Sequence, residues 1–435
     1  MSKYLQYFKQ AWNIIRQEKL FSGIYIAGTG LSITIVMALS IVFYIKMANI
    51  YPETNRDRLL VVRTAMETSK GGDRGVAFLS PQTVEACFSG LKSAEAVSIV
   101  VLWPGGKFFI QPDGTKEQLN VSLKYVDENF WTVFPFRFVD GKAFGEADVR
   151  SGIRTAVIAE SLARRLFGTA EATGRTFSLD FETYRVCGVV RDVSFLTDHT
   201  YAQVWTPYTL CPNYEAVFDR TLGRMTVYIL APSAGGMEDI RREVEENVRR
   251  YNLALGDDVE FSIAGQPDTQ WQTVLRPDRA ETTVNFSRVV LQYALVFLVL
   301  LLIPAVSLSG MTHSRMERRM AETGVRRAFG ATTGGLMMQI VTENLLFTLL
   351  GGVVGLLSSY ALVALSKGWM MQLMGASVVS TGLSDSAGIV LTPSMLLNWP
   401  VLFIAIGICF VLNLLSSLVP AWNHARRGII HSLNK

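Results

Sequence analysis

Residues 20–45 read LFSGIYIAGTGLSITIVMALSIVFYI, an apolar run without one charged side chain. A helix needs about 20 predominantly apolar residues to cross a bilayer, so this run predicts a membrane span. Three further uncharged runs, at residues 289–312, 344–366 and 398–422, predict three more spans. No small-residue cleavage pattern follows the first run, and we expect an uncleaved anchor rather than a signal peptide.

The composition of the whole chain agrees with a membrane protein. Of its 435 residues, 49% are hydrophobic and only 18% are charged, which is too apolar for an ordinary soluble protein of this length. The net charge of +4 gives no support to nucleic-acid binding. The cysteines and histidines lack metal-ligand spacing, so no metal site is predicted. A Cys87–Cys211 disulfide is compatible with the sequence but has no support in it.

Basic residues in the short segments set the predicted orientation. Residues 1–19, 313–343 and 423–435 carry several lysines and arginines, whereas the short loop 367–397 carries only Lys367. Short basic segments are retained on the cytoplasmic side. We therefore expect both termini in the cytoplasm and residues 46–288 outside it, as a domain long enough to fold by itself.

The first segment, residues 1–19, has a polarity pattern of its own. Its apolar side chains share one helical face, and its basic residues lie elsewhere. This pattern predicts a cytoplasmic amphipathic helix in the membrane interface. The apolar face consists of Tyr4, Leu5, Phe8, Trp12 and Ile15.

The long outer segment alternates between strand and helix patterns, which predicts a mixed α+β domain. Residues 155–159 suit a strand, and residues 160–167 suit a helix stopped by Gly168. Residues 176–180 and 184–190 suit a strand pair, and 237–252 an amphipathic helix. No nucleophile elbow or catalytic triad pattern is present, so we do not expect an enzyme.

The segment 313–343 combines arginines with apolar residues at ordered positions. Gly324 and Gly330 interrupt it, which favours two short helical pieces. Apolar side chains projecting from a basic frame can insert into a groove on a cytoplasmic partner. A loop that only set the topology would explain the arginines but not the apolar positions.

Three glycines lie close together in the third predicted span. Gly351 and Gly355 are small residues four apart, with Gly352 beside them, and this spacing allows another helix to approach closely. That helix can belong to the same chain or to a second copy, and the sequence does not choose between them.

Several stretches resemble the FtsX-like permease family, in particular its MacB-type members with a periplasmic core domain. MERRMAETGVRRAFGA (316–331) is similar to the family's R-x-x-E-I-G-x-R-x-A-x-G-A loop, and GGVVG (351–355) and VPAWNHAR (419–426) are similar to its third span and tail. In the outer segment YVDENFW (125–131), GKAF (141–144), RLFG (165–168) and VCGVV (186–190) resemble the periplasmic core.

The resemblance implies an ABC-type transporter subunit in the bacterial inner membrane. The outer domain would have a porter-like part and an inserted β-rich lobe at about residues 100–200. Neither Gly-Lys pair of the chain fits a Walker A motif, so the chain itself would bind no cofactor. ATP and Mg would be bound by a partner, a cytoplasmic ABC ATPase dimer. Residues that would couple to the ATPase are Met316, Arg318, Arg319, Met320, Glu322, Gly324, Val325, Arg326, Arg327, Phe329 and Gly330.

The further partners implied are a second permease chain, identical or related, and either a periplasmic adaptor with an outer-membrane duct or an envelope enzyme. The expected function is export of a peptide, lipoprotein, drug or other amphiphile. The alternative is an FtsX-like mechanotransmitter that regulates an envelope partner without moving cargo.

Overall fold

The computed structural model describes residues 19–102, 108–111, 118–194, 197–218, 220–276, 284–296 and 332–365, with single positions among 9–17, 298–299 and 403–414. These residues fall into two compact units. The helical unit takes its residues from 1–43, 290–370 and 393–435, and the outer unit takes its residues from 44–289 and 371–392.

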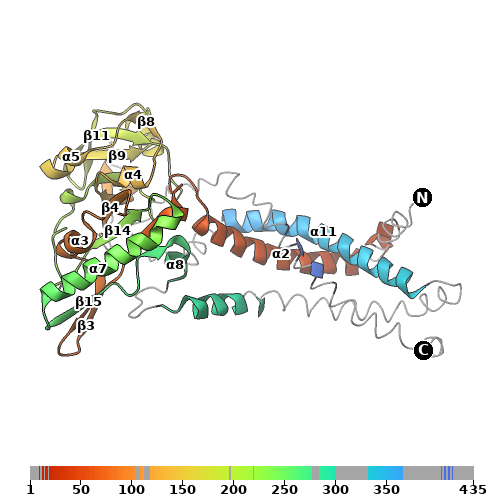
Figure 1. The fold of residues 1–435 in the computed structure, drawn as a ribbon. Coiled ribbons are helices and arrows are strands. Elements are labelled where there is room, and N and C mark those ends of the chain that lie inside the picture. The colour runs from red at the N-terminus through yellow and green to blue at the C-terminus, as the bar shows by residue number, and fades with distance from the viewer. Residues whose placement is uncertain are drawn as a thin grey trace. The chain divides into compact units, whose positions relative to one another are not determined.

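The helical unit contains α11 (Thr333–Leu365) and most of α2 (Lys19–Met47), which are drawn in blue and red-brown in Figure 1. The last residues of α2, from Tyr44 onward, belong to the outer unit. Of the described residues, only the helix segment Val341–Leu362 is long and apolar enough to cross a membrane, and Ser22–Ala38 and Phe286–Val296 are shorter apolar helices. The count of four spans therefore stays a prediction. Helix α11 begins at Thr333, inside the segment assigned to the cytoplasmic loop.

The outer unit is built on a mixed sheet with strand order β15-β2-β3-β14-β4-β7-β12-β9-β11-β10-β5-β6. Strands β7 and β12 are parallel, as are β9 and β11, while the other pairs along this order are antiparallel. The expected mixed α and β domain is confirmed. Its strands are β1 (Leu59–Val62), β2 (Ala65–Ser69), β3 (Arg74–Leu79), β4 (Ala96–Val101), β5 (Phe108–Gln111), β6 (Leu119–Val121), β7 (Leu123–Val126), β8 (Phe138–Gly141), β9 (Thr155–Ala159), β10 (Thr176–Leu179), β11 (Glu182–Val190), β12 (Val204–Pro207), β13 (Leu222–Gly223), β14 (Met225–Leu230), β15 (Val259–Ser262) and β16 (Asp268–Thr269).

Helices lie against this sheet and against one another. Helix α7 buries Ile240 and Val244 and contacts both α3 and β15, so its apolar stripe is the face turned to the core. Figure 1 shows α7 in green. The helices of this unit are α3 (Pro81–Phe88), α4 (Phe130–Val133), α5 (Glu146–Ser151), α6 (Glu160–Phe167), α7 (Met237–Leu255) and α8 (Gln270–Leu275), with short 3-10 turns η1 (Arg56–Arg58), η2 (Tyr208–Leu210) and η3 (Ala234–Gly236).

The local predictions for this domain are confirmed with small shifts of boundary. Strand β9 and helix α6 have the predicted bounds, and Gly168 ends α6 with a left-handed φ of 74° that glycine adopts without strain. Strands β10 and β11 pair antiparallel, although β11 begins two residues earlier than expected. Helix α7 runs on to Leu255 because its amphipathic pattern continues to Gly256.

The first and last strands of the outer unit lie side by side. Leu60 and Val61 of β1 pair with Thr269 and Asp268 of β16. On its other side β1 pairs with β14, which places it inside the sheet. The two chain connections of this unit are therefore held together by main-chain hydrogen bonds.

Candidate functional site at the end of helix α2

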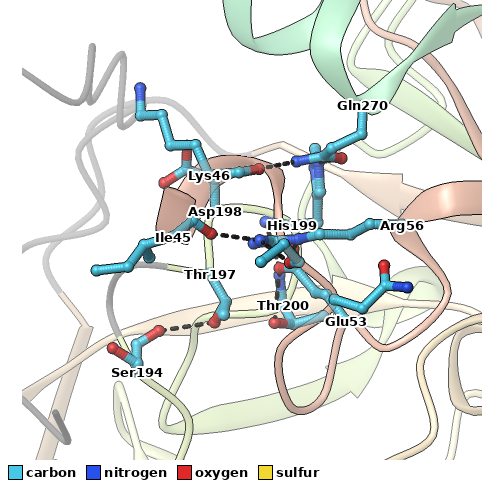
Figure 2. A network of polar contacts seen from close by, with 12 residues as sticks. Ile45, Lys46, Glu53, Arg56, Ser194, Thr197, Asp198, His199, Thr200 and Gln270 are labelled. Atoms are coloured by element: carbon cyan, nitrogen blue, oxygen red, sulfur yellow. Dashed lines mark hydrogen bonds and ion pairs between the residues drawn. The ribbon is translucent and has the colours of Figure 1, made fainter. Parts of the chain in front are cut away.

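The C-terminus of α2, which belongs to the outer unit, is capped by side chains of that same unit. The last four carbonyls of a helix have no partner within it. Here Arg56 donates to the carbonyl oxygen of Ile45 and, at 2.7 Å, to that of Ala48, while Gln270 Nε2 donates to the carbonyl of Lys46 at 2.7 Å (Figure 2). A cation at this position is also favoured by the helix dipole. The last residues of α2 are thus bonded to η1 and α8 within the outer unit.

The arginine of this cap forms a buried ion pair. Arg56 Nη2 lies 2.6 Å from Glu53 Oε2, and Arg56 Nε donates to the same oxygen at 2.7 Å. The two residues are only 3% and 1% exposed. A buried pair of this kind depends on both members, because removing one leaves an uncompensated charge.

The second carboxylate oxygen of Glu53 holds a turn of the chain that is distant in sequence. Oε1 accepts hydrogen bonds from the backbone N–H groups of His199 and Thr200, both at 3.0 Å, and from Thr200 Oγ1 at 2.9 Å. Burial by itself raises the pKa of Glu53, but the charge of Arg56 and these hydrogen bonds outweigh it, so the pKa is lowered from its ordinary value. Glu53 is a carboxylate at neutral pH.

The chain turn at His199 and Thr200 is also hydrogen-bonded to two central strands, β7 and β12. Lys124 on β7 donates from Nζ to the carbonyl oxygens of Asp198 and His199, at 2.9 and 2.8 Å. Trp205 on β12, fully buried, donates from Nε1 to the carbonyl of Thr200 at 3.2 Å. A continuous chain of hydrogen bonds therefore runs from the end of α2 through Arg56 and Glu53 into the sheet.

A histidine closes this network on its other side. His199 Nε2 lies 3.2 Å from Gln270 Oε1, and the amide nitrogen of Gln270 is the donor to Lys46. Burial lowers the pKa of His199 to about 4, so the ring is neutral at pH 7 and can donate from Nε2. Gln270 is the first residue of α8, whose start is fixed by a capping box between Thr269 and Gln272.

The predicted packing glycines lie on α11 and face other helices of the chain. A Cβ added to Gly351 would stand 2.9 Å from Thr29 Cβ, and one added to Gly355 would stand 2.7 Å from Ile33 Cβ, both on α2. The helices therefore touch closely here, as small-residue stripes allow. A Cβ on Gly352 would meet Ile406 at 3.3 Å.

Polar and aromatic contacts accompany this close approach. Thr34 Oγ1 donates to the carbonyl of Gly30 at 2.7 Å and lies 3.3 Å from that of Gly355. The rings of Tyr25 and Phe347 have centroids 4.9 Å apart. Among the described residues, Gly351 and Gly355 therefore pack against α2, whereas Gly352 lies nearest to Ile406.

Every residue assigned to ATPase coupling, from Met316 to Gly330, lies outside the described residues. Cys87 and Cys211 are buried free thiols, so the structure contains no disulfide between them, and burial raises the pKa of both to about 12. Over the part of the chain that the structure describes, no group of three or more His, Cys, Asp or Glu residues could hold a metal ion.

Sequence reasoning missed the polar cap. A local signal existed, because Glu53 and Arg56 are opposite charges three residues apart, soon after an apolar span. His199 and Gln270 carried no such signal, since they come from distant parts of the chain and only the folded sheet brings them to Glu53 and Lys46.

Two family models match the chain. Residues 22–247 match the MacB-like periplasmic core domain, and residues 294–429 match the FtsX-like permease C-terminal region. Among curated relatives, an uncharacterized ABC transporter permease YknZ of Bacillus subtilis is 20% identical over 64% of this chain and 67% of its own length. The macrolide export ATP-binding/permease protein MacB of Chromobacterium violaceum is 25% identical over 72% of this chain.

The chain spans 43% of the length of that MacB protein. Among solved structures, the periplasmic region of MacB from Actinobacillus actinomycetemcomitans is 16% identical, with 51% of this chain and 94% of that one covered and a TM-score of 0.34. The first family model alone matches more than half of the sequence. The chain therefore belongs to the FtsX-like ABC transporter permeases that carry a MacB-like periplasmic core domain.

Proposed function

We propose that this chain is the membrane-spanning subunit of an ABC-type transporter and that it couples ATP hydrolysis by a separate cytoplasmic ATPase to movement of its outer domain. Its family membership supports a permease role. The observation that supports the coupling is the polar cap within the outer unit, where Arg56, Glu53 and Gln270 bond the last residues of α2.

The hydrogen bonds of the cap resist rotation of the end of α2 against the sheet. Turning the end of α2 against the sheet would break the bonds of Arg56 to Ile45 and Ala48 and that of Gln270 to Lys46. Each hydrogen bond to a charged group contributes about 1.5–3 kcal/mol, and a separated Glu53–Arg56 pair would leave buried charges unpaired. In this proposal, a displacement of the end of α2 would act on β7 and β12 through Glu53 and the turn at His199.

In the proposed topology, the loop 313–343 that binds the ATPase lies on the cytoplasmic side. The spans are residues 20–45, 289–312, 344–366 and 398–422, both termini are cytoplasmic, and the loop 313–343 docks on an ATPase dimer that binds ATP and Mg. Two permease chains, identical or related, complete the assembly. The spans carry no Asp, Glu, Lys or Arg, which argues against a polar conduit and for mechanical transmission. The proposed cargo is a peptide, lipoprotein, drug or other amphiphile.

Replacing Val325 and Phe329 by aspartate tests the docking of the ATPase. The double variant should insert into the membrane normally but lose the ATPase on purification in mild detergent, because two charges would enter an apolar groove. Mass spectrometry of the co-purified proteins gives the result. The matched control replaces Val139 and Ile153, two exposed aliphatic residues of the outer unit, by aspartate.

Retention of an ATP-binding-cassette subunit by the double variant would refute the assignment of the loop. If the wild-type chain purifies folded without such a subunit, the transporter proposal itself fails. A different result would make the chain a signalling subunit instead. In that case the ATPase is present but no amphiphile stimulates its ATP turnover, and a cell-wall hydrolase binds the outer domain.

A further inference from the structure

Helix α8 touches both chain connections of the outer unit through two consecutive residues. The side-chain amide of Gln270 donates to the carbonyl of Lys46 at 2.7 Å, and the ring of Trp271 packs on Phe286 with centroids 5.3 Å apart and planes at 67°. Lys46 directly follows the first predicted span. Phe286 begins the apolar helix Phe286–Val296. Helix α8 thus lies where both connections leave the outer unit.

The indole of Trp271 is close to the level at which the second span begins. Phe286 precedes Val289, the first residue of that span, by three residues, which is about 4.5 Å of helix. The polar layer of a bilayer is roughly 5–7 Å deep on each side of its hydrocarbon core. A ring that packs on Phe286 therefore lies at the depth of the lipid headgroups.

The chemistry of this surface fits that layer. Trp271 is 42% exposed although it is large and apolar. The neighbouring cation of Arg276, 5.6 Å from the ring of Phe286, is already paired with Asp268, at 2.8 Å, and both members of that pair are buried. The surface at Trp271 therefore presents an amphipathic ring rather than a charge from Arg276. Indole rings concentrate at membrane interfaces because one part is apolar and the N–H can be hydrated.

We propose that Trp271 inserts into the headgroup layer of the outer leaflet and holds α8 at the membrane surface. This inference rests on the proposed topology, in which residues 289–312 form a span. Since Gln270 also holds the end of α2, one anchored helix sets the height of both span ends against the bilayer. The partner of this surface is lipid, and a second copy of the chain on Trp271 is the competing outcome.

Quenching by brominated lipids tests the proposal. The full-length chain is reconstituted into phosphatidylcholine–phosphatidylglycerol vesicles with bromine placed on the acyl chain either near the headgroup or near the bilayer centre. The chain has eight tryptophans, so the emission of Trp271 is obtained as the difference between the wild type and Trp271→Phe. That difference should be quenched at least about twofold more by shallow than by deep bromine, as expected for an interfacial ring.

Trp205→Phe is the matched control, because Trp205 is completely buried in the sheet and its difference emission should not respond to either lipid. Protease protection of the outer domain in the same vesicles shows whether the chain is inserted. A chain that fails to insert refutes the topology. If the chain is inserted but the difference emission of Trp271 is not quenched, this inference alone is refuted. It is also refuted if a photo-crosslinker at position 271 links to a second protein chain rather than to lipid.

Discussion

Helix α2 is held in two different ways along its length. In its middle, Gly30 and Ile33 lie against Gly351 and Gly355 of α11, with backbones close enough that an added Cβ would collide. At its end, Arg56 and Gln270 bond the helix carbonyls, and Glu53 balances the charge. The first contact depends on shape and the second on paired polar groups.

The two kinds of contact respond differently to strain. Helix packing through small residues sums many weak van der Waals contacts, so a small displacement changes its energy gradually. A buried ion pair whose carboxylate also accepts four hydrogen bonds changes abruptly, because losing one member leaves a buried charge unpaired. We therefore expect that the middle of α2 can shift slightly against α11, whereas the end of α2 resists displacement because its polar bonds must break.

Removing Glu53 should cause the largest loss of stability at either of the two contacts of α2. Glu53→Ala leaves Arg56 buried without its partner and should lower the free energy of unfolding of the outer unit by about 3–5 kcal/mol. Urea unfolding of the full-length chain in detergent, followed by tryptophan fluorescence, measures it. Glu53→Leu combined with Arg56→Met should recover most of the loss, since the unpaired charge is then absent. The control Glu246→Ala breaks an exposed pair with Arg250 and should lower the free energy of unfolding far less. Equal losses in the two variants would contradict the proposed role of the Glu53–Arg56 pair.

Acidification should weaken the same polar cap through His199. Its folded pKa of about 4 lies below the ordinary 6.5, so the unfolded chain binds a proton first as the pH falls. Stability is then complete above pH 6.5 and decreases by roughly 3 kcal/mol as the pH falls to about 4. Glu53, whose folded pKa is also lowered, adds a further loss below its unfolded value of 4.5. Denaturant unfolding at a series of pH values measures this, and His199→Gln should flatten the curve between pH 6.5 and 4. An unchanged slope in that variant would assign the dependence to other groups.

Adding one methyl group to the glycine contact should have a moderate effect. In Gly355→Ala the new Cβ would stand 2.7 Å from Ile33 Cβ and 2.8 Å from the carbonyl of Gly30, so the helices must separate. We expect a loss of about 1–3 kcal/mol, seen as a lower melting temperature in detergent. Gly334→Ala on the same helix is the control, because nothing lies within 4 Å of its Cβ position and alanine favours a helix. Equal melting temperatures for the two variants would show that the close contact does not contribute.

The smallest effect is expected from the hydroxyl of Thr34. Thr34→Val keeps the shape and removes the bonds to Gly30 and Gly355, which should cost about 0.6 kcal/mol, the average for hydrogen bonds between membrane helices. The same melting assay resolves this when several repeats are averaged. A loss as large as that of Gly355→Ala would mean that polar bonding rather than shape holds the middle of α2.

The sequence predicted the elements of the outer domain better than the polar cap. Strand β9 and helix α6 follow from patterns contained in a few adjacent residues, and Gly168 marks the end of the helix. The glycine stripe was also visible, but its spacing is the same for a partner in this chain and for one in a second chain. Only the structure shows α2 against it.

The polar cap could not be predicted because its parts are far apart in the chain. The bond from Glu53 to His199 spans 146 residues, and that from Gln270 to Lys46 spans 224. No local periodicity relates such positions, since their meeting depends on the order of strands in the sheet. The polar residues of a cap like this look like surface residues until the fold buries them.

The pairing of β1 with β16 also bears on how such proteins diversify. The first and last strands meet at one seam, next to both connections to the helices, so the outer domain behaves as a cassette whose ends are adjacent. Strands far from the seam, such as β5 and β6 at the end of the sheet, could be gained, lost or replaced without altering the spacing of the connections. One arrangement of the two connections can in this way serve outer domains of different size.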